Sequence, residues 1–119
     1  INIGSIAGKE AYAKGAVYCA TKFAVDGLTR ALRMDMLGTG VKVSALHPGM
    51  VETEFSQVRF HGDTARAAAV YEGTRPLKAS DVAQTLLWMA SQPAHVNLAD
   101  VLLLPTDQAA AGQVHRSMA

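Results

Sequence analysis

Residues 16–40 read AVYCATKFAVDGLTRALRMDMLGTG and contain the longest helical pattern of the chain. Small and apolar residues recur in it at steps of three and four, which is the spacing of one face of an α-helix. The members of this face are Ala20, Phe23, Ala24, Gly27, Leu28, Ala31 and Leu32. The pattern predicts a helix from about Ala16 to Leu37, ended by the glycines of Gly38-Thr39-Gly40.

Apolar runs on both sides of this helix have the composition of buried strands. Residues 1–4 read as the end of one strand, residues 5–14 as a loop, and residues 41–46 as the next strand, closed by Pro48-Gly49. Ser80 is the predicted N-cap of a later helix. The remaining predicted elements are a loop with one or two helical turns through residue 63, helices over 65–72 and 81–91, and a last strand over 101–104. This alternation predicts an α/β fold with a parallel sheet and right-handed crossovers, and 119 residues suit one domain.

Three polar side chains near the start of the chain favour a particular chemistry. Tyr18 and Lys22 are four residues apart, so they share one face of the predicted helix. A lysine ammonium there favours the phenolate and lowers the tyrosine pKa from its usual value of about 10. Such a tyrosine is a usable acid or base near neutral pH. Ser5 follows the first strand and is placed to bond the oxygen at which the proton moves. The three residues favour carbonyl–alcohol interconversion, with a cofactor carrying the hydride.

The predicted sheet brings these residues to one place. Ligands of open α/β sheets bind beyond the carboxyl ends of the strands. Ser5 follows the first predicted strand and residues 48–53 follow the second, while Tyr18 and Lys22 lie in the first turns of the helix between them. We therefore expect all of them at one edge of the sheet.

These residues resemble the short-chain dehydrogenase/reductase family. The motif stands here as Gly4-Ser5, then Tyr18 thirteen residues after Ser5, then Lys22, and finally His47-Pro48-Gly49-Met50-Val51-Glu52-Thr53. A tyrosine and a lysine at this spacing are common alone, but the serine and the Pro-Gly-x-Val-x-Thr element make the pattern specific. Residues 53–60, 87–89, 93–97 and 114–116 are similar to the branch of NADP-dependent 3-hydroxy acid dehydrogenases. The segment 50–53 is one residue shorter than we expect in that branch.

The resemblance implies a Rossmann-like doubly wound sheet with Ser5, Tyr18 and Lys22 as catalytic residues. It implies NADP as cofactor, with NAD left open. Lys22 is expected to bind the nicotinamide ribose, the Gly49 and Val51 backbone the carboxamide, and the Thr53 hydroxyl the carboxamide or pyrophosphate. The whole expected cofactor set is Tyr18, Lys22, Pro48, Gly49, Met50, Val51 and Thr53. Expected substrates are small 3-hydroxy or 3-oxo acids such as serine, allo-threonine or malonic semialdehyde, handled by a homodimer or homotetramer.

Features that a complete dinucleotide fold needs are missing from the sequence. No G-x-G-x-x-G turn is present, and Gly4 and Gly8 do not have its spacing. The chain begins with Ile1-Asn2-Ile3, as if inside a strand. The sequence therefore predicts the C-terminal half of a dinucleotide-binding oxidoreductase domain over residues 1–119, with the N-terminal half missing.

A carboxylate-bearing substrate calls for a fork of hydrogen-bond donors. Arg59, after the Pro-Gly element, is the first candidate, while Arg66 and Arg75 are weaker ones. Ser5 and Tyr18 complete the predicted substrate site. No metal site is predicted, because the spacing of His47, His61, His95 and His115 resembles no ligand set.

Composition excludes several classes of partner. Eleven basic and ten acidic residues leave a net charge of +1 without a basic block, so neither nucleic acid nor a membrane surface is an expected partner. Apolar stretches are too short to span a membrane. The single cysteine, Cys19, allows no internal disulfide and agrees with a cytoplasmic protein.

Two alternatives remain. A third, a serine hydrolase, is disfavoured, because it needs glycines two residues before and after its nucleophile and Ser5 has Ile3 at the first of these positions. A catalytically incomplete piece would keep these side chains but serve only as a structural or dimerising unit, with an uncovered sheet edge. A short-chain reductase of another carbonyl substrate would share the whole motif.

Overall fold

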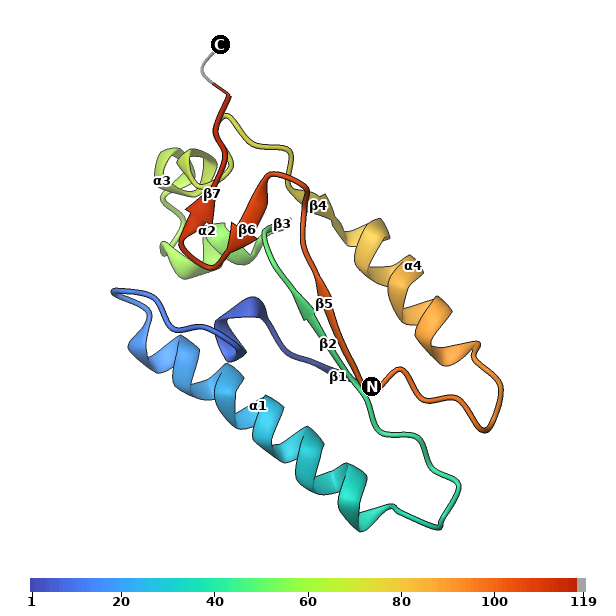
Figure 1. Cartoon of the computed structure of the whole chain (residues 1–119). Coiled ribbons are helices and arrows are strands. Elements are labelled where there is room, and N and C mark those ends of the chain that lie inside the picture. Colours follow the sequence, from blue (N-terminus) through green and yellow to red (C-terminus); the bar gives the residue numbers. More distant parts are fainter. Residues whose placement is uncertain (118–119) are drawn as a thin grey trace.

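The computed structural model describes residues 1–117, in which helices lie on both sides of a small parallel sheet (Figure 1). The sheet contains β1 (Asn2–Ile3), β2 (Ala45–Pro48) and β5 (Asp100–Leu103), in the order β1-β2-β5. The first connection contains the short 3-10 helix η1 (Ile6–Gly8) and the long helix α1 (Ala16–Asp35). The other elements are β3 (Val51–Glu52), α2 (Phe55–Arg59), α3 (Thr64–Ala69), β4 (Leu77–Lys78), α4 (Ala79–Ala90), β6 (Gln108–Ala110) and β7 (Gln113–Val114). The α/β class and the parallel sheet are confirmed.

The central strand β2 is buried along its whole length, as expected for a strand paired on both sides. Its register with β1 sets Ile3 opposite Leu46, and its register with β5 sets Pro48 opposite Leu103. The predicted strand 41–46 is wrong in its bounds, because the ladder runs over 45–48. Side chains take the backbone groups before it: the carbonyl of Val43 accepts from Arg33 Nε at 2.9 Å and from Asn97 Nδ2 at 3.1 Å.

Helix α1 ends two residues before the predicted Leu37, and its predicted apolar face is not the face that packs on the sheet. Phe23 is 47% exposed to solvent and Leu28 is 56% exposed. The sheet-facing side is polar instead. Thr29 is buried and accepts a hydrogen bond from Asn2 Nδ2 at 3.0 Å, and Arg33 donates to the carbonyls of Val43 and Ala99. Polar anchors therefore fix α1 on the sheet, and its apolar side is left uncovered.

The second half of the chain differs from the prediction in detail. Helix α4 starts earlier than predicted, so Ser80 lies inside its first turn; Lys78 is the N-cap, and its N–H donates to Asp81 Oδ2 at 2.7 Å. Helix α3 is shorter than 65–72. Strand β5 begins one residue early and is not fully buried, since Leu102 is 48% exposed. The pairs β3–β4 and β6–β7 were not predicted. Among residues 1–117, no helix has the length and hydropathy to cross a membrane.

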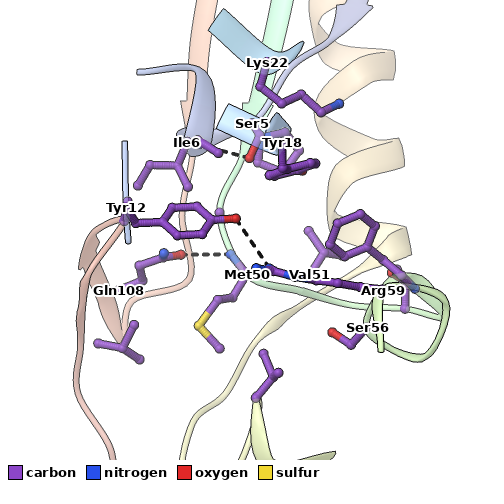
Figure 2. A pocket seen from close by; sticks show the side chains of 18 of the residues that line it. Ser5, Ile6, Tyr12, Tyr18, Lys22, Met50, Val51, Ser56, Arg59 and Gln108 are labelled. Atoms are coloured by element: carbon purple, nitrogen blue, oxygen red, sulfur yellow. Dashed lines mark hydrogen bonds between the residues drawn. The ribbon is translucent and has the colours of Figure 1, made fainter. Parts of the chain in front are cut away.

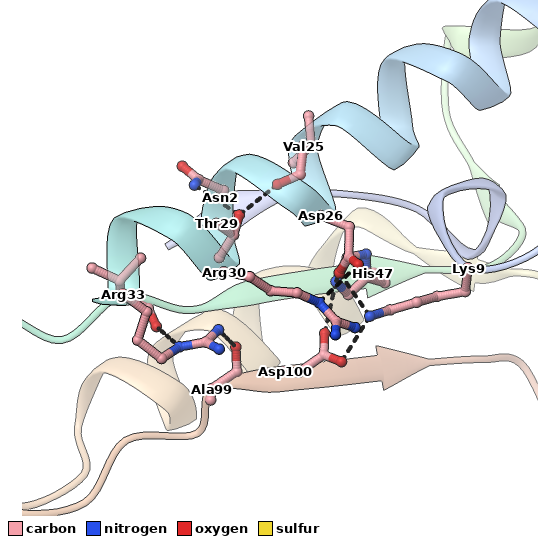
Figure 3. Close-up of polar contacts among 11 residues, drawn as sticks. Asn2, Lys9, Val25, Asp26, Thr29, Arg30, Arg33, His47, Ala99 and Asp100 are labelled. Atoms are coloured by element: carbon pink, nitrogen blue, oxygen red, sulfur yellow. Dashed lines mark hydrogen bonds and ion pairs between the residues drawn. The ribbon is translucent and has the colours of Figure 1, made fainter. Parts of the chain in front are cut away.

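A charged cluster of Lys9, Asp26, His47 and Asp100, called here the Lys9 cluster, links the first loop, α1, β2 and β5 (Figure 3). Lys9 Nζ lies 2.8 Å from Asp26 Oδ1 and 2.7 Å from Asp100 Oδ2. The hydrogen bond from Lys9 lowers the pKa of Asp26, although partial burial opposes it. For Asp100, burial raises the pKa, but the hydrogen bond and charge of Lys9 outweigh it, so this pKa is also lowered. Burial of Lys9 is likewise outweighed by its hydrogen bonds to the two carboxylates, and its pKa is raised.

The lowered pKa of Asp26 predicts an acid-dependent loss of stability. A carboxylate with a folded-state pKa below its unfolded value stabilises the fold above the unfolded pKa of about 4, and this contribution is lost as the pH falls through the folded value. Asp26→Asn removes the charge that faces Lys9, Arg30 and His47. We expect it to lower the unfolding free energy by about 1–3 kcal/mol at pH 7, and the difference to shrink as the pH falls below about 4.

Urea denaturation of the parent and the variant at several pH values measures this difference. Asp35→Asn, at the exposed end of α1, is the matched control and should show no comparable loss at pH 7. A destabilisation by Asp26→Asn that is constant from pH 7 to acid would contradict the charge-based explanation.

Candidate active site

Ser5 lies where β1 ends. The N–H of Gly4 continues the ladder by donating to Leu46 O at 2.8 Å, and the chain then turns into η1. Ser5 caps this turn: its Oγ accepts from Ala7 N–H at 3.1 Å. Only 8% of the residue is exposed. Because its oxygen is already an acceptor within the turn, the hydroxyl hydrogen of Ser5 is free to point toward a ligand.

Tyr18 and Lys22 lie in the first turns of α1, as predicted. Lys22 Nζ lies 5.9 Å from the centroid of the Tyr18 ring and donates to the Ile3 carbonyl at 3.2 Å. The other neighbour of the tyrosine ring is Phe55, at a centroid distance of 5.4 Å. The lysine charge is therefore held between the end of β1 and the tyrosine.

The loop after Ser5 packs directly on the helix backbone at Lys22. A Cβ atom on Gly8 would lie 2.6 Å from the Lys22 carbonyl oxygen and 2.9 Å from its carbonyl carbon. Backbone atoms cannot move aside as a flexible side chain can, so only glycine fits this position. The contact fixes the distance between the loop of Ser5 and the helix turn of Lys22.

The segment after β2 forms the next wall of the site. Gly49 N–H is already used in the sheet, donating to Leu103 O at 2.8 Å, so a ligand could meet only its carbonyl group. The N–H of Met50 donates to Gln108 Oε1 at 2.8 Å. The Val51 carbonyl accepts from Tyr71 at 2.9 Å, and Thr53 Oγ1 accepts from Phe55 N–H at 3.2 Å. The backbone of this segment is thus held by residues from distant parts of the chain.

All predicted site residues except the weaker candidates Arg66 and Arg75 line one pocket of about 490 Å³ (Figure 2). Ser5, Tyr18 and Lys22 lie together at one end of it. Residues of β2 and of the segment after it also line the pocket, and the predicted members among them are Pro48, Gly49, Met50, Val51 and Thr53. The structure therefore brings together side chains that the sequence separates by almost fifty residues.

Arg59 is the only one of the three candidate arginines that lines the described pocket. Its Nη1 lies 3.4 Å from the Tyr12 hydroxyl, and its guanidinium lies 5.7 Å from the centroid of the Tyr12 ring. Arg66 instead stacks on Phe60 at 4.5 Å, outside the lining. The Arg75 side chain faces Asp107 at 3.5 Å.

The pocket also contains residues that the sequence did not single out. Gln108 is 7% exposed and holds Met50. Tyr71 joins Val51 and lies 2.8 Å from Ser56 Oγ. Arg116 donates to the carbonyls of Glu72 and Val70 and so fastens the end of the described chain to the region of α3. Arg116 belongs to the segment 114–116, whose resemblance to the 3-hydroxy acid dehydrogenase branch could have pointed to it. No local sequence pattern marks Gln108 or Tyr71.

Comparison with known proteins agrees with this geometry. The family model for short chain dehydrogenases matches residues 1–64. An NADP-dependent 3-hydroxy acid dehydrogenase of Schizosaccharomyces pombe is 44% identical over the whole chain, which covers 46% of that protein. A serine 3-dehydrogenase of Agrobacterium fabrum is 41% identical over 98% of the chain, which covers 47% of it.

Among solved structures, the closed form of a serine dehydrogenase complexed with NADP+ superposes with a TM-score of 0.90. It is 45% identical, and the match covers 98% of this chain and 48% of that one. The serine dehydrogenase of Escherichia coli gives a TM-score of 0.71 at 35% identity, with 92% of this chain and 40% of that one covered.

This chain therefore spans about half the length of the relatives that it matches. Its fold, its serine, tyrosine and lysine in one pocket, and the family match over its first 64 residues agree with one another. The chain belongs to the short chain dehydrogenase family.

Proposed function

We propose that this chain carries the catalytic residues of an NADP-dependent oxidoreductase that transfers a hydride between its cofactor and a small 3-hydroxy or 3-oxo acid. The observation that carries the proposal is the meeting of Ser5, Tyr18 and Lys22 in one pocket beyond the ends of β1 and β2. The names of the relatives support the substrate class, since they include 3-hydroxy acid and serine dehydrogenases. Serine, allo-threonine and malonic semialdehyde are the candidate substrates.

The residues present fit a nicotinamide dinucleotide. Lys22 has three N–H donors and uses one on Ile3, which leaves donors for a ribose diol. Tyr18 and the segment Pro48–Val51 with Thr53 would hold the rest of the nicotinamide end. When bound, this cofactor supplies the acceptor or the donor of the hydride. NADP is favoured over NAD by the relatives, one of which is a structure with NADP+.

The side chains have distinct roles in this proposal. Tyr18 takes the proton of the substrate hydroxyl in the oxidation direction and returns it in the reduction direction. Lys22 stabilises the phenolate by its positive charge. Ser5 donates its hydroxyl hydrogen to the substrate oxygen, because its Oγ already accepts from Ala7. All three residues act at one position of the substrate, the oxygen of its hydroxyl or carbonyl group.

Arg59 would recognise the substrate carboxylate. It lies on α2, lines the same pocket as Tyr18, and has donors beyond its weak contact with Tyr12. A planar guanidinium binds a carboxylate through two parallel hydrogen bonds. With this assignment, the protein recognises the carboxylate of the substrate as well as its hydroxyl group.

Residues 1–119 would form one part of a single dinucleotide-binding domain in a homodimer or homotetramer. Apolar residues exposed on α1 and α4 support a further covering surface; they include Val17, Phe23, Leu28, Met34, Leu87 and Trp88. The same exposure is the observation that favours the alternative of a catalytically incomplete, structural piece. Binding of NADPH distinguishes the enzyme from the structural piece, because only the enzyme is expected to bind the cofactor.

Tyr18→Phe removes the proton-carrying hydroxyl and keeps the ring that packs on Phe55. We expect kcat to fall by about 10²- to 10⁴-fold, with an unchanged circular dichroism spectrum. Steady-state kinetics with NADP+ and serine measure it. Turnover within about tenfold of the parent would contradict the assigned role.

Lys22→Ala removes both a charge near Tyr18 and a donor to the ribose. We expect a lower kcat together with weaker NADPH binding, measured by fluorescence titration. If affinity falls while kcat at saturating cofactor stays at the parental value, Lys22 does not assist Tyr18.

Arg59→Met should raise KM for 3-hydroxy acids by about 10- to 100-fold, the equivalent of a lost charged hydrogen bond, and change KM for a neutral ketone much less. Arg66→Met is the matched control, because Arg66 lies in the same region but outside the pocket lining. Equal effects of Arg59→Met on acid and ketone would reject carboxylate recognition.

A further inference from the structure

Lys9 connects the elements that carry the proposed catalytic residues (Figure 3). It follows η1 directly, on the loop that begins with Ser5. Its ammonium bonds Asp26 of α1 at 2.8 Å and Asp100 of β5 at 2.7 Å. Asp26 follows Lys22 by four residues and Tyr18 by eight, so all three share one side of α1. One side chain therefore links the loop of Ser5 to the helix face of Tyr18 and Lys22.

The link between Lys9 and Ser5 is short and internally bonded. Gly8 N–H donates to the Ser5 carbonyl at 2.8 Å, and Lys9 N–H donates to the Ile6 carbonyl at 2.9 Å. The loop is therefore a single tight turn, and a shift of Lys9 is passed on to Ser5.

The fourth member of the cluster acts on the other side of Ser5. His47 is fully buried, and a Cβ atom on Gly4 would lie 2.2 Å from its Nδ1. His47 Nε2 lies 2.8 Å from Asp100 Oδ1 without forming a hydrogen bond to it. The imidazole is thus wedged between Gly4 and the carboxylate that Lys9 also holds. Ser5 therefore lies between Gly4, which packs against His47, and the turn that Lys9 links to Asp26.

The carboxylates of this cluster are compensated by cations from the chain itself. The possible ligand atoms of Asp26, His47 and Asp100 lie within 4.8 Å of one another, which is close enough to hold a metal ion. The ammonium of Lys9, however, contacts both carboxylates, and Arg30 Nε bonds Asp26 Oδ2 at 3.0 Å. The carboxylates of Asp26 and Asp100 are thus neutralised by Lys9 and Arg30. The ion pairs of Lys9 link the first loop to α1 and β5.

We infer that Lys9 is a positioning residue of the active site, which holds Ser5 at its working distance from Tyr18 and Lys22 through the ion pairs to Asp26 and Asp100. The inference rests on the function proposed above. It predicts that loss of the Lys9 charge affects the reaction at the substrate oxygen, where Ser5 acts, and leaves the cofactor contacts of Lys22 intact.

The test compares three variants of the protein by kcat, KM, NADPH affinity and hydrogen exchange of residues 5–10. Lys9→Met removes the link. Lys9→Arg keeps a cation that reaches both carboxylates. Arg30→Met is the matched control, because it removes a cation from the same Asp26 but joins α1 only to itself.

Lys9→Met should lower kcat by about 10- to 100-fold, the cost of a misplacement of about 1 Å, with NADPH affinity within about threefold of the parent. Faster exchange of residues 5–10 should accompany it. Lys9→Arg should recover most of the rate, and Arg30→Met should keep it. If Lys9→Met does not fold, Asp26→Asn must show the same loss of kcat at retained NADPH affinity.

Two results would overturn the inference while the proposed function stands. One is a parental kcat for folded Lys9→Met despite faster exchange in its loop, and the other is an equal loss of kcat in Arg30→Met. A parent protein that binds NADPH but oxidises no 3-hydroxy acid would instead refute the proposed function, and the positioning role would fall with it.

Discussion

Parallel pairing of β1 with β2 is the constraint on which the site depends. It requires a crossover connection, and the helix of that connection starts at the edge where both strands end. Ser5, just after β1, and Pro48, the last residue of β2, consequently lie at one edge of the sheet, and Tyr18 and Lys22 lie in the helix turns nearest to it. Each of these four residues lies at the end of a strand, just after one, or in the first turns of a helix.

Close packing turns this topology into a defined geometry. Gly8 brings the first loop into contact with the Lys22 backbone, and the Lys9 cluster ties that loop to α1, β2 and β5. Helix α1 is fastened by polar anchors such as Thr29 and Arg33, while apolar residues of the same helix remain exposed. This division suits a helix that holds the proposed catalytic residues on one side, while its apolar side stays exposed.

The sequence predicted the architecture well because strands and helices have local patterns. The alternation of elements and the start of α1 follow from local spacing. The grouping of Ser5 with Tyr18 and Lys22 follows from the rule that ligands bind beyond the carboxyl ends of parallel strands. Errors arose where distant side chains decide the outcome. Arg33 and Asn97 donate to the backbone that was predicted to extend β2. The N-cap of α4 is a local error, because Lys78, whose N–H donates to Asp81, takes this position in place of Ser80.

Contacts between distant segments were also beyond the reach of the sequence. Gln108 supports Met50 across 58 residues, and Lys9 meets Asp100 across 91. Neither residue belongs to a local motif, so neither was found until the fold placed it. The prediction that the histidines form no metal site likewise rested on their spacing in the sequence. That spacing could not show that His47 lies beside the carboxylates of Asp26 and Asp100.

The most direct test of the account follows the hydride itself. Serine or allo-threonine that carries deuterium on the hydroxyl-bearing carbon is incubated with the protein and NADP+, and the reduced cofactor is examined by mass spectrometry and NMR. If the chain transfers a hydride as proposed, deuterium appears at C4 of the nicotinamide and the reaction slows relative to the unlabelled substrate. Reduced cofactor without deuterium, or no reduction by any 3-hydroxy acid, would contradict it.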